Sequence, residues 1–170
     1  MLNKIIEYDK KIAFFMTNYY HHHYLNETMK LISSCGDFGI NWLIVILITN
    51  FFDQTRSMSI DMLIALIGAT LIGQITIKSI VKRKRPCHLY KDVHMLVPIP
   101  NDLSFPSGHT TSSFACSTVM FLYNPLLGSI GLFYAILTAL SRLYLFVHYF
   151  SDVVVGMLLG ITIGFIVYLI

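Results

Sequence analysis

Charged residues are scarce in this sequence. Lys, Arg, Asp and Glu together make up 12% of its 170 residues, whereas hydrophobic residues make up 55% and the mean hydropathy is +0.67. Soluble domains carry about 25% charged residues, so this composition excludes an ordinary soluble domain. So much apolar surface needs lipid as its solvent, and the sequence therefore predicts an integral membrane protein.

Cysteine pairs and acidic clusters are also missing. The three cysteines, Cys35, Cys87 and Cys116, form no C-x-x-C pair and no disulfide framework. No cluster of acidic residues supplies a magnesium or two-metal site. The adjacent histidines at 21–23 lack the i, i+4 spacing of a helical metal site. The sequence therefore predicts no metal and no other cofactor.

The basic residues gather in one short segment. Residues 82–85 read Lys-Arg-Lys-Arg and lie between long apolar runs. A nucleic-acid-binding domain carries its basic residues on one soluble face or stripe, so we expect no nucleic-acid partner. We expect Lys82, Arg83 and Lys84 to be solvated or to contact anionic lipid headgroups.

Apolar runs predict an all-α bundle of about five transmembrane helices, in a single domain over residues 1–170. A helix needs about 20 residues to cross the hydrocarbon at ~1.5 Å per residue. The expected spans are residues 40–52 (extendable back through Leu31), 62–77, 105–123, 126–147 and 153–170, within a transmembrane catalytic core at 36–170. Charges interrupt residues 1–35, where we expect interfacial helices with a Tyr-rich part at the headgroup level.

An arginine, a histidine and an aspartate interrupt the apolar C-terminal half. His148 and Asp152 are four residues apart, so the carboxylate reaches the imidazole if Asp152 opens a helix. A carboxylate on one ring nitrogen fixes the tautomer and leaves the other nitrogen free to attack or to accept a proton. Arg142, six residues earlier, is suited to hold an anion. By itself, this segment also fits a buried structural histidine and an interfacial arginine.

Spans that alternate in direction bring four helix ends to one membrane surface. These ends are the end of the second span, the start of the third, the end of the fourth and the start of the fifth. This surface gathers Lys78, Arg85, His109, Arg142, His148 and Asp152. Ionisable groups at the mouth of an apolar bundle are costly and indicate a functional site. Lys78 and Arg85 are seven residues apart and share a face if their helix continues to Pro86.

The segment Pro106-Ser107-Gly108-His109 begins the third span. Gly108 permits close backbone approach, the free N–H groups of a helix start suit an anion, and Ser107 adds a hydroxyl donor. A serine hydrolase would need a G-x-S-x-G elbow, which the sequence lacks. A phosphoryl group fits better. Lys78, Arg85 and Arg142 are suited to neutralise the phosphoryl oxygens. His148 is suited to attack phosphorus, and His109 is suited to protonate the leaving oxygen.

These segments together resemble the signature of the type 2 phosphatidic acid phosphatase superfamily. The motifs are Lys78-x6-Arg85-Pro86, Pro106-Ser107-Gly108-His109 and Ser141-Arg142-x5-His148-x3-Asp152, in the family's order. The resemblance implies a metal-independent phosphatase that works through a phosphohistidine. It implies His148 as nucleophile, Asp152 as its partner, His109 as acid and base, and Lys78, Arg85, Ser107, Gly108 and Arg142 as phosphate ligands. Phe146 and Phe150 stand where many members have Gly and Pro.

The resemblance also implies removal of the terminal phosphate from a membrane lipid phosphate or diphosphate. Undecaprenyl diphosphate is the expected substrate, with phosphatidylglycerophosphate, phosphatidic acid and lipid A phosphate as alternatives. A non-catalytic protein that binds anionic lipid headgroups, and phosphotransfer to an acceptor other than water, also remain open. The resemblance suggests a multi-pass protein with an extracytoplasmic active site, whereas the positive-inside rule favours a cytoplasmic location for the basic segment 82–91.

Overall fold

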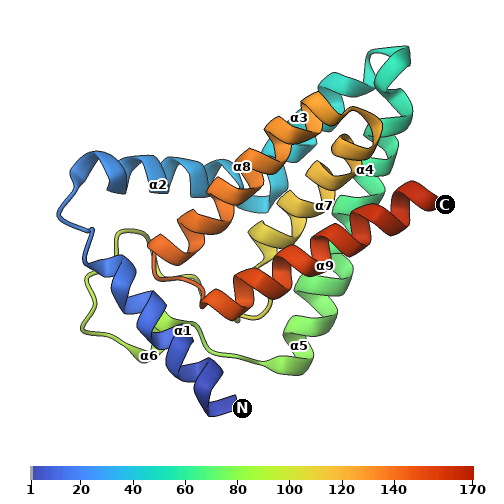
Figure 1. Ribbon diagram of the computed structural model, residues 1–170. Coiled ribbons are helices and arrows are strands. Elements are labelled where there is room, and N and C mark those ends of the chain that lie inside the picture. The colour runs from blue at the N-terminus through green and yellow to red at the C-terminus, as the bar shows by residue number, and fades with distance from the viewer. Residues whose placement is uncertain (1) are drawn as a thin grey trace.

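The computed structural model describes residues 2–170, which form helices and no strand (Figure 1). The α-helices are α1 (Leu2–Thr17), α2 (His23–Cys35), α3 (Ile40–Asn50), α4 (Arg56–Ala69), α5 (Lys78–Val81), α6 (Pro86–Leu89), α7 (Gly108–Tyr123), α8 (Pro125–Tyr144) and α9 (Phe150–Leu169). Two 3₁₀ turns, η1 (Asp37–Gly39) and η2 (Asp53–Thr55), and a π-helical stretch, η3 (Thr70–Ile77), connect some of them. The predicted all-α membrane bundle is confirmed.

The number of spans stays a prediction. Within residues 2–170, three helical segments are long and apolar enough to cross a membrane, namely Asp53–Leu89, Pro125–Tyr144 and Phe150–Leu169, and α2 with α3 makes a fourth if that bent pair is one span. The first expected span does not extend straight back through Leu31, because α2 and α3 meet at 47°. The break falls at Phe38 and Gly39, whose φ angles of 56° and 70° are left-handed and end the helical ladder.

The central helix is α7, which packs against α4, α8 and α9 (Figure 1). It has 16 residues, and its Ser and Thr side chains are mostly buried. Their hydroxyl groups bond to nearby protein atoms: Ser117 donates to the carbonyl oxygen of Ser113 at 2.7 Å, and Ser113 accepts from the indole of Trp42 at 3.1 Å. A polar helix is stable here because its neighbours shield it and satisfy its hydroxyl groups.

Helix α9 lies directly on the backbone of α7 through glycines four residues apart. A Cβ atom at Gly160 would lie 2.4 Å from the carbonyl oxygen of Thr111, and one at Gly164 would lie 2.6 Å from that of Ala115. Small residues at this spacing let membrane helices approach closely. The contact brings the starts of the two helices together, and the N–H of Ser107 donates to the carbonyl oxygen of Asp152 at 3.1 Å.

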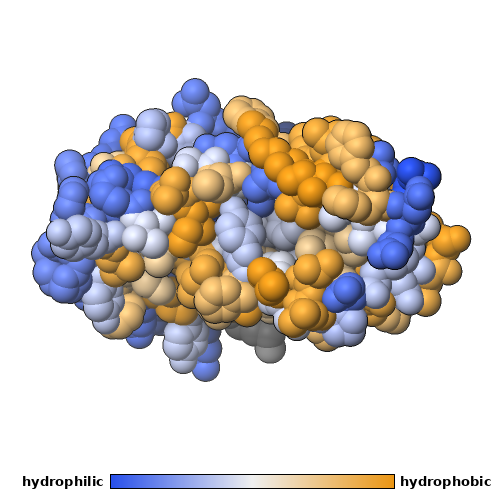
Figure 2. All heavy atoms as spheres, turned by 90° about the horizontal axis from the view of Figure 1, so that it is seen from above, coloured by the Kyte–Doolittle hydropathy of each residue, from blue (hydrophilic) through white to orange (hydrophobic). Residues whose placement is uncertain are grey.

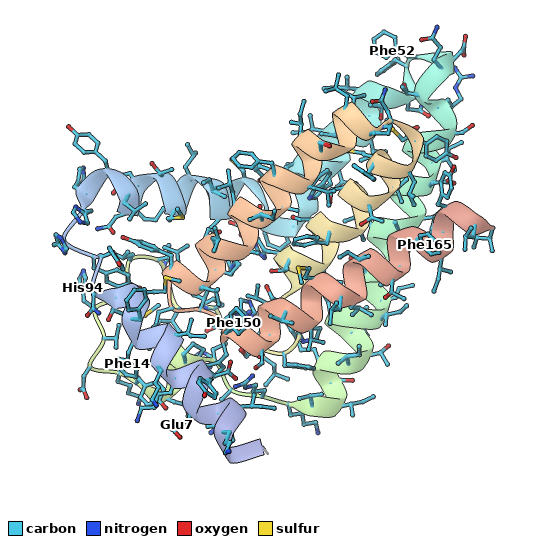
Figure 3. The ribbon with its side chains drawn as sticks, in the orientation of Figure 1. Glu7, Phe14, Phe52, His94, Phe150 and Phe165 are labelled. Carbon is cyan, nitrogen blue, oxygen red and sulfur yellow. The ribbon has the colours of Figure 1, made fainter. Side chains whose placement is uncertain are left out.

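The outer faces of α3, α8 and α9 carry exposed apolar side chains. They include Leu43, Ile44 and Leu47 on α3, Ile130, Phe133 and Ile136 on α8, and Leu158, Phe165 and Ile166 on α9. Figure 2 shows hydrophobic residues over the middle of one face and hydrophilic residues gathered towards its two ends. In Figure 3, Phe52 in the α3–α4 turn lies far from Phe150 at the start of α9. An apolar belt between polar ends suits a helical bundle in a bilayer.

The segment predicted to lie at the membrane interface, residues 1–35, consists mostly of the helices α1 and α2. Met1 of this segment lies outside the described residues. Helix α1 packs across α8 and α9, whereas α2 packs beside α8 (Figure 1). Asp9 of α1 is buried and accepts a hydrogen bond from the N–H of Ser151 at 2.8 Å. Their location at the membrane surface, and the division into residues 1–35 and a single catalytic core at 36–170, remain our proposals.

Candidate active site

A cavity of about 690 Å³ joins the three motifs of the sequence. Six of the eight predicted site residues line it: Lys78, Arg85, Gly108, His109, Arg142 and His148. Its remaining wall is largely apolar and comes from α3 and α4, with Leu43, Leu63, Leu66 and Ile67. Residues far apart in the sequence therefore form one cavity with a cationic part and an apolar part.

His148 is buried in the segment that connects α8 to α9. Its Nε2 atom lies 2.8 Å from Nη1 of Arg85, and its Nδ1 atom lies 3.5 Å from Oδ2 of Asp152. A guanidinium group only donates, so Nε2 accepts and the ring proton lies on Nδ1, towards the carboxylate. Burial, followed by the positive charges of Arg85 and the other cations of the cavity, lowers the pKa of His148 well below its ordinary 6.5. The imidazole is therefore neutral at neutral pH, with the lone pair of Nε2 directed to Arg85.

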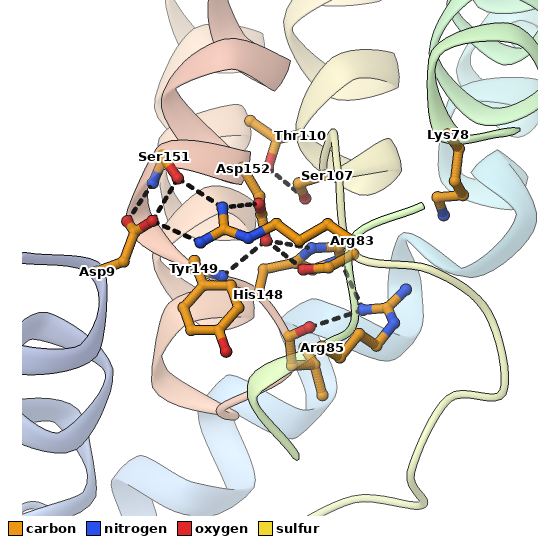
Figure 4. Close-up of polar contacts among 12 residues, drawn as sticks. Asp9, Lys78, Arg83, Arg85, Ser107, Thr110, His148, Tyr149, Ser151 and Asp152 are labelled. Carbon is orange, nitrogen blue, oxygen red and sulfur yellow. Dashed lines mark hydrogen bonds and ion pairs between the residues drawn. The ribbon is translucent and has the colours of Figure 1, made fainter. Parts of the chain in front are cut away.

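Asp152 lies fully buried behind His148 in the first turn of α9. This is the helix start that the four-residue spacing assumed. The N–H of Tyr149 donates to Oδ2 at 2.8 Å, Nη1 of Arg83 donates to Oδ1 at 2.6 Å, and the hydroxyl of Ser104 donates to Oδ2 (Figure 4). These donors fix the carboxylate in one orientation beside the imidazole.

The prediction that Arg83 is solvated or contacts headgroups is wrong. Besides Asp152, its guanidinium bonds the hydroxyl of Ser151 at 2.7 Å and Oδ2 of Asp9 at 2.7 Å (Figure 4). It also lies 4.0 Å from the centre of the Tyr149 ring. The side chain of Arg83 thus points into the protein, where it pairs with the buried carboxylates of Asp9 and Asp152. The neighbouring Lys82 and Lys84 are exposed.

Lys78 and Arg85 do not share a helical face as predicted. The helix ends at Val81 because Lys82 adopts left-handed backbone with a φ of 51°. The two cations meet instead at Asp102 of the long loop, which the sequence analysis missed. Oδ2 of Asp102 lies 2.5 Å from Nζ of Lys78, and Oδ1 lies 2.7 Å from Nη2 of Arg85. Partial burial opposes the ionisation of Asp102, but the two cations outweigh it and lower its pKa to about 2.

Arg142 is buried in the last turn of α8 and donates through Nη1 to the hydroxyl of Ser33 in α2. Among the described residues, its Nε atom has no hydrogen-bond partner. Because buried N–H groups are nearly always paired, this donor beside the cavity is suited to an anionic ligand.

Gly108 and Ser107 occupy different positions at the start of α7. Gly108 lines the cavity, and a Cβ atom there would lie 1.2 Å from Nε2 of Gln74, so a larger residue would displace the end of that side chain. Ser107 is buried behind this wall, and its hydroxyl accepts a hydrogen bond from Thr110 at 2.9 Å (Figure 4). On the same helix, Nε2 of His109 lies 2.9 Å from Oδ1 of Asp37, a second carboxylate that the sequence analysis missed.

The model of the PAP2 superfamily matches residues 59–170, well over half of the chain. The chain belongs to the PAP2 superfamily. Among PAP2 relatives, an undecaprenyl-diphosphatase of Sulfolobus acidocaldarius is 31% identical over 143 residues, which cover 84% of this chain and 68% of the relative. A decaprenylphosphoryl-5-phosphoribose phosphatase of Mycobacterium tuberculosis is 38% identical over 142 residues, which cover 82% of this chain and 77% of the relative.

Two solved structures share the PAP2 fold over nearly the whole chain. The crystal structure of Aquifex aeolicus LpxE superposes with a TM-score of 0.83 at 27% identity and covers 94% of both chains. A PAP2-type phosphatidylglycerolphosphate phosphatase of Bacillus subtilis gives a TM-score of 0.79 at 26% identity, over 97% of this chain and 85% of that one. The protein is thus a membrane lipid phosphatase, and the non-catalytic alternative is set aside.

One departure from the PAP2 signature is accommodated by packing. Phe146 has a φ of 58°, a conformation that favours glycine and costs a phenylalanine about 1–3 kcal/mol. Its fully buried ring packs edge-on against Phe14 at 5.4 Å and Tyr90 at 6.2 Å between ring centres. Each such pair contributes about 0.5–1.5 kcal/mol beyond area burial, which offsets the backbone cost and ties α1 to the turn before His148.

Proposed function

We propose that this PAP2 phosphatase removes the terminal phosphate of a lipid phosphate or diphosphate through a phosphohistidine at His148, without a metal. The observation that carries the proposal is a buried imidazole whose Nε2 atom lies 2.8 Å from Nη1 of Arg85 inside a cation-lined cavity. Among the described residues, no three His, Cys, Asp or Glu side chains gather into a metal-binding group. Neutralisation of the phosphate oxygens falls instead to Lys78, Arg85 and Arg142, and Gly108, in front of the buried Ser107, offers a backbone N–H at the start of α7.

The reaction takes place in two displacements. Nε2 of His148 forms a bond to phosphorus as the bond from phosphorus to the lipid oxygen breaks, and His109 gives that oxygen a proton. His109 then takes a proton from a water molecule, whose oxygen attacks phosphorus as the N–P bond breaks. Inorganic phosphate leaves and both histidines return to their starting states. Asp152 keeps the proton of His148 on Nδ1 throughout.

The shape of the cavity supports a lipid as the substrate. The cationic wall binds the phosphate, and the apolar wall from α3 and α4 lies beside it and suits the first part of a hydrocarbon chain. Two relatives have names that specify a polyprenyl lipid, undecaprenyl diphosphate in one and a decaprenyl phosphate derivative in the other. We therefore propose undecaprenyl diphosphate as the first substrate to test, ahead of phosphatidylglycerophosphate, phosphatidic acid and lipid A phosphate. We also propose a multi-pass location in the cell membrane with an extracytoplasmic cavity.

Phosphate release by the purified protein in detergent, with excess EDTA, tests the proposal. We expect release from undecaprenyl diphosphate above the other lipids, a phosphoenzyme that survives alkali but not acid, and a loss of about 10³-fold or more in His148→Ala. Full turnover by His148→Ala, or activity that EDTA abolishes and magnesium restores, would contradict the mechanism. Absence of release from every lipid would contradict the function.

A further inference from the structure

The break between α2 and α3 is built around the ring of His109. A Cβ atom at Gly36 would lie 2.9 Å from Cδ2 of this ring, so the imidazole packs closely against the backbone of Gly36. The next residue, Asp37, places Oδ1 at 2.9 Å from Nε2 of the ring. Two consecutive residues of the break therefore contact His109: Gly36 by close packing and Asp37 by a hydrogen bond.

The backbone of the break is strained at Phe38, and burial of the Phe38 side chain does not offset this strain. Phe38 has a φ of 56°, an unfavourable conformation for a bulky residue, and its side chain is 95% exposed. Left-handed backbone at a non-glycine residue is costly and is characteristic of functional sites. The part of the turn that makes a specific contact with the cavity is the carboxylate of Asp37, beside His109.

The two carboxylates of the cavity contact different groups: Asp102 contacts Lys78 and Arg85, and Asp37 contacts His109. Among the described residues, two carboxylates line the cavity, Asp37 and Asp102. Asp102 already bonds Lys78 and Arg85. A proton on both nitrogens of His109 would add positive charge to a cavity that holds three other cations, and Asp37 is the carboxylate in contact with this ring.

We propose that Asp37 is a positioning residue for the acid–base chemistry of His109, an inference that rests on the proposed function. The ionised carboxylate holds the N–H of Nε2 and offsets the positive charge of the imidazolium. This leaves Nδ1 as the ring atom that passes its proton to the leaving oxygen and later receives one from water. Asp37 gains and loses no proton in either displacement.

The proposal predicts a loss that depends on the leaving group. An alkoxide leaves only with a proton, whereas 4-nitrophenolate leaves readily without one. We therefore compare Asp37→Asn with wild type on dioctanoyl phosphatidic acid and on 4-nitrophenyl phosphate. Asp37→Asn should lower kcat/KM for the lipid about 10- to 100-fold, mainly through kcat, and for the aryl phosphate less than about threefold. In a His109→Ala background, Asp37→Asn should cause no further loss on the lipid.

A second variant and a matched control complete the experiment. Gly36→Ala would push the ring away from its contact, and should show the same selective loss with Asp37 intact. Asp53→Asn removes an 87% exposed carboxylate in the distant α3–α4 turn and should leave both activities unchanged. If Asp37→Asn does not fold, as judged by gel filtration and melting, the Gly36→Ala comparison takes its place.

Equal losses on the two substrates, or no loss on either, would overturn the role of Asp37 while leaving a working phosphatase. A wild-type protein that hydrolyses neither these substrates nor the lipids tested above would instead overturn the proposed function, and the role of Asp37 with it.

Discussion

The guanidinium of Arg83 lies 2.6 Å from the carboxylate of Asp152 and makes a second ion pair, at 2.7 Å, with Asp9. Removing one partner of a buried pair costs about 3–5 kcal/mol, because the other charge is left uncompensated. We expect Arg83→Met to lower the melting temperature in detergent and to reduce kcat at least about tenfold, since the Asp152 carboxylate loses a donor that fixes it. Lys84→Met removes an exposed charge next to it and serves as control. Equal behaviour of the two variants would show that the Arg83 pair has no role in the site.

Asp102 makes ion pairs with Lys78 and Arg85, two of the cations that we propose bind the phosphate. Asp102→Asn should leave two buried cations without their counter-charge, and therefore lower the melting temperature in phosphate-free buffer. Inorganic phosphate should bind this variant about 5- to 10-fold more tightly than wild type, because it no longer competes with a resident carboxylate. The measurement is the rise in melting temperature with phosphate concentration. Asp92→Asn, at an exposed position of the same loop, should match wild type. A similar or smaller phosphate response in Asp102→Asn would refute the competition.

The stability of the protein should depend on pH through His148. Burial and the nearby cations lower the pKa of His148 well below the 6.5 expected of the unfolded chain. Its contribution to stability is therefore complete above pH 6.5 and is lost as the pH falls below that value, where the unfolded state binds the proton first. The difference in melting temperature between wild type and His148→Gln should shift against wild type between pH 7 and pH 5. A constant difference over this range would mean that the folded state does not depress the pKa.

The contact between α7 and α9 should not tolerate a methyl group. In Gly160→Ala the new carbon would lie 2.4 Å from a backbone oxygen, which cannot move as a side-chain end would. We expect a loss of about 1–3 kcal/mol in stability, seen as a lower melting temperature. Gly68→Ala is the matched control, because its nearest neighbour, a methyl group of Ile163, would be at 3.4 Å. A variant at 160 as stable as the one at 68 would show that the helices can separate freely.

The sequence was sufficient to predict the membrane bundle and the meeting of the ionisable site residues, five of which line the cavity with Asp152 behind His148, because both depend on regular patterns. Apolar runs mark helices, and helices that alternate in direction bring their ends together. The carboxylates Asp37 and Asp102 and the inward cation Arg83 lie in breaks and loops, where no periodicity applies. Asp37 and Arg83 also adjoin left-handed residues, Phe38 and Lys82, whose conformation is uncommon for these residue types and cannot be read from the sequence.

The tie between α1 and the rest of the chain has a consequence for biosynthesis. Asp9 has partners at Arg83 and Ser151, which follow it by 74 and 142 residues. Helix α1 therefore cannot make all of its final contacts until α9 has been synthesised. Until then Asp9 lacks its contacts with Ser151, and the acidic site around Arg83 and Asp152 is incomplete.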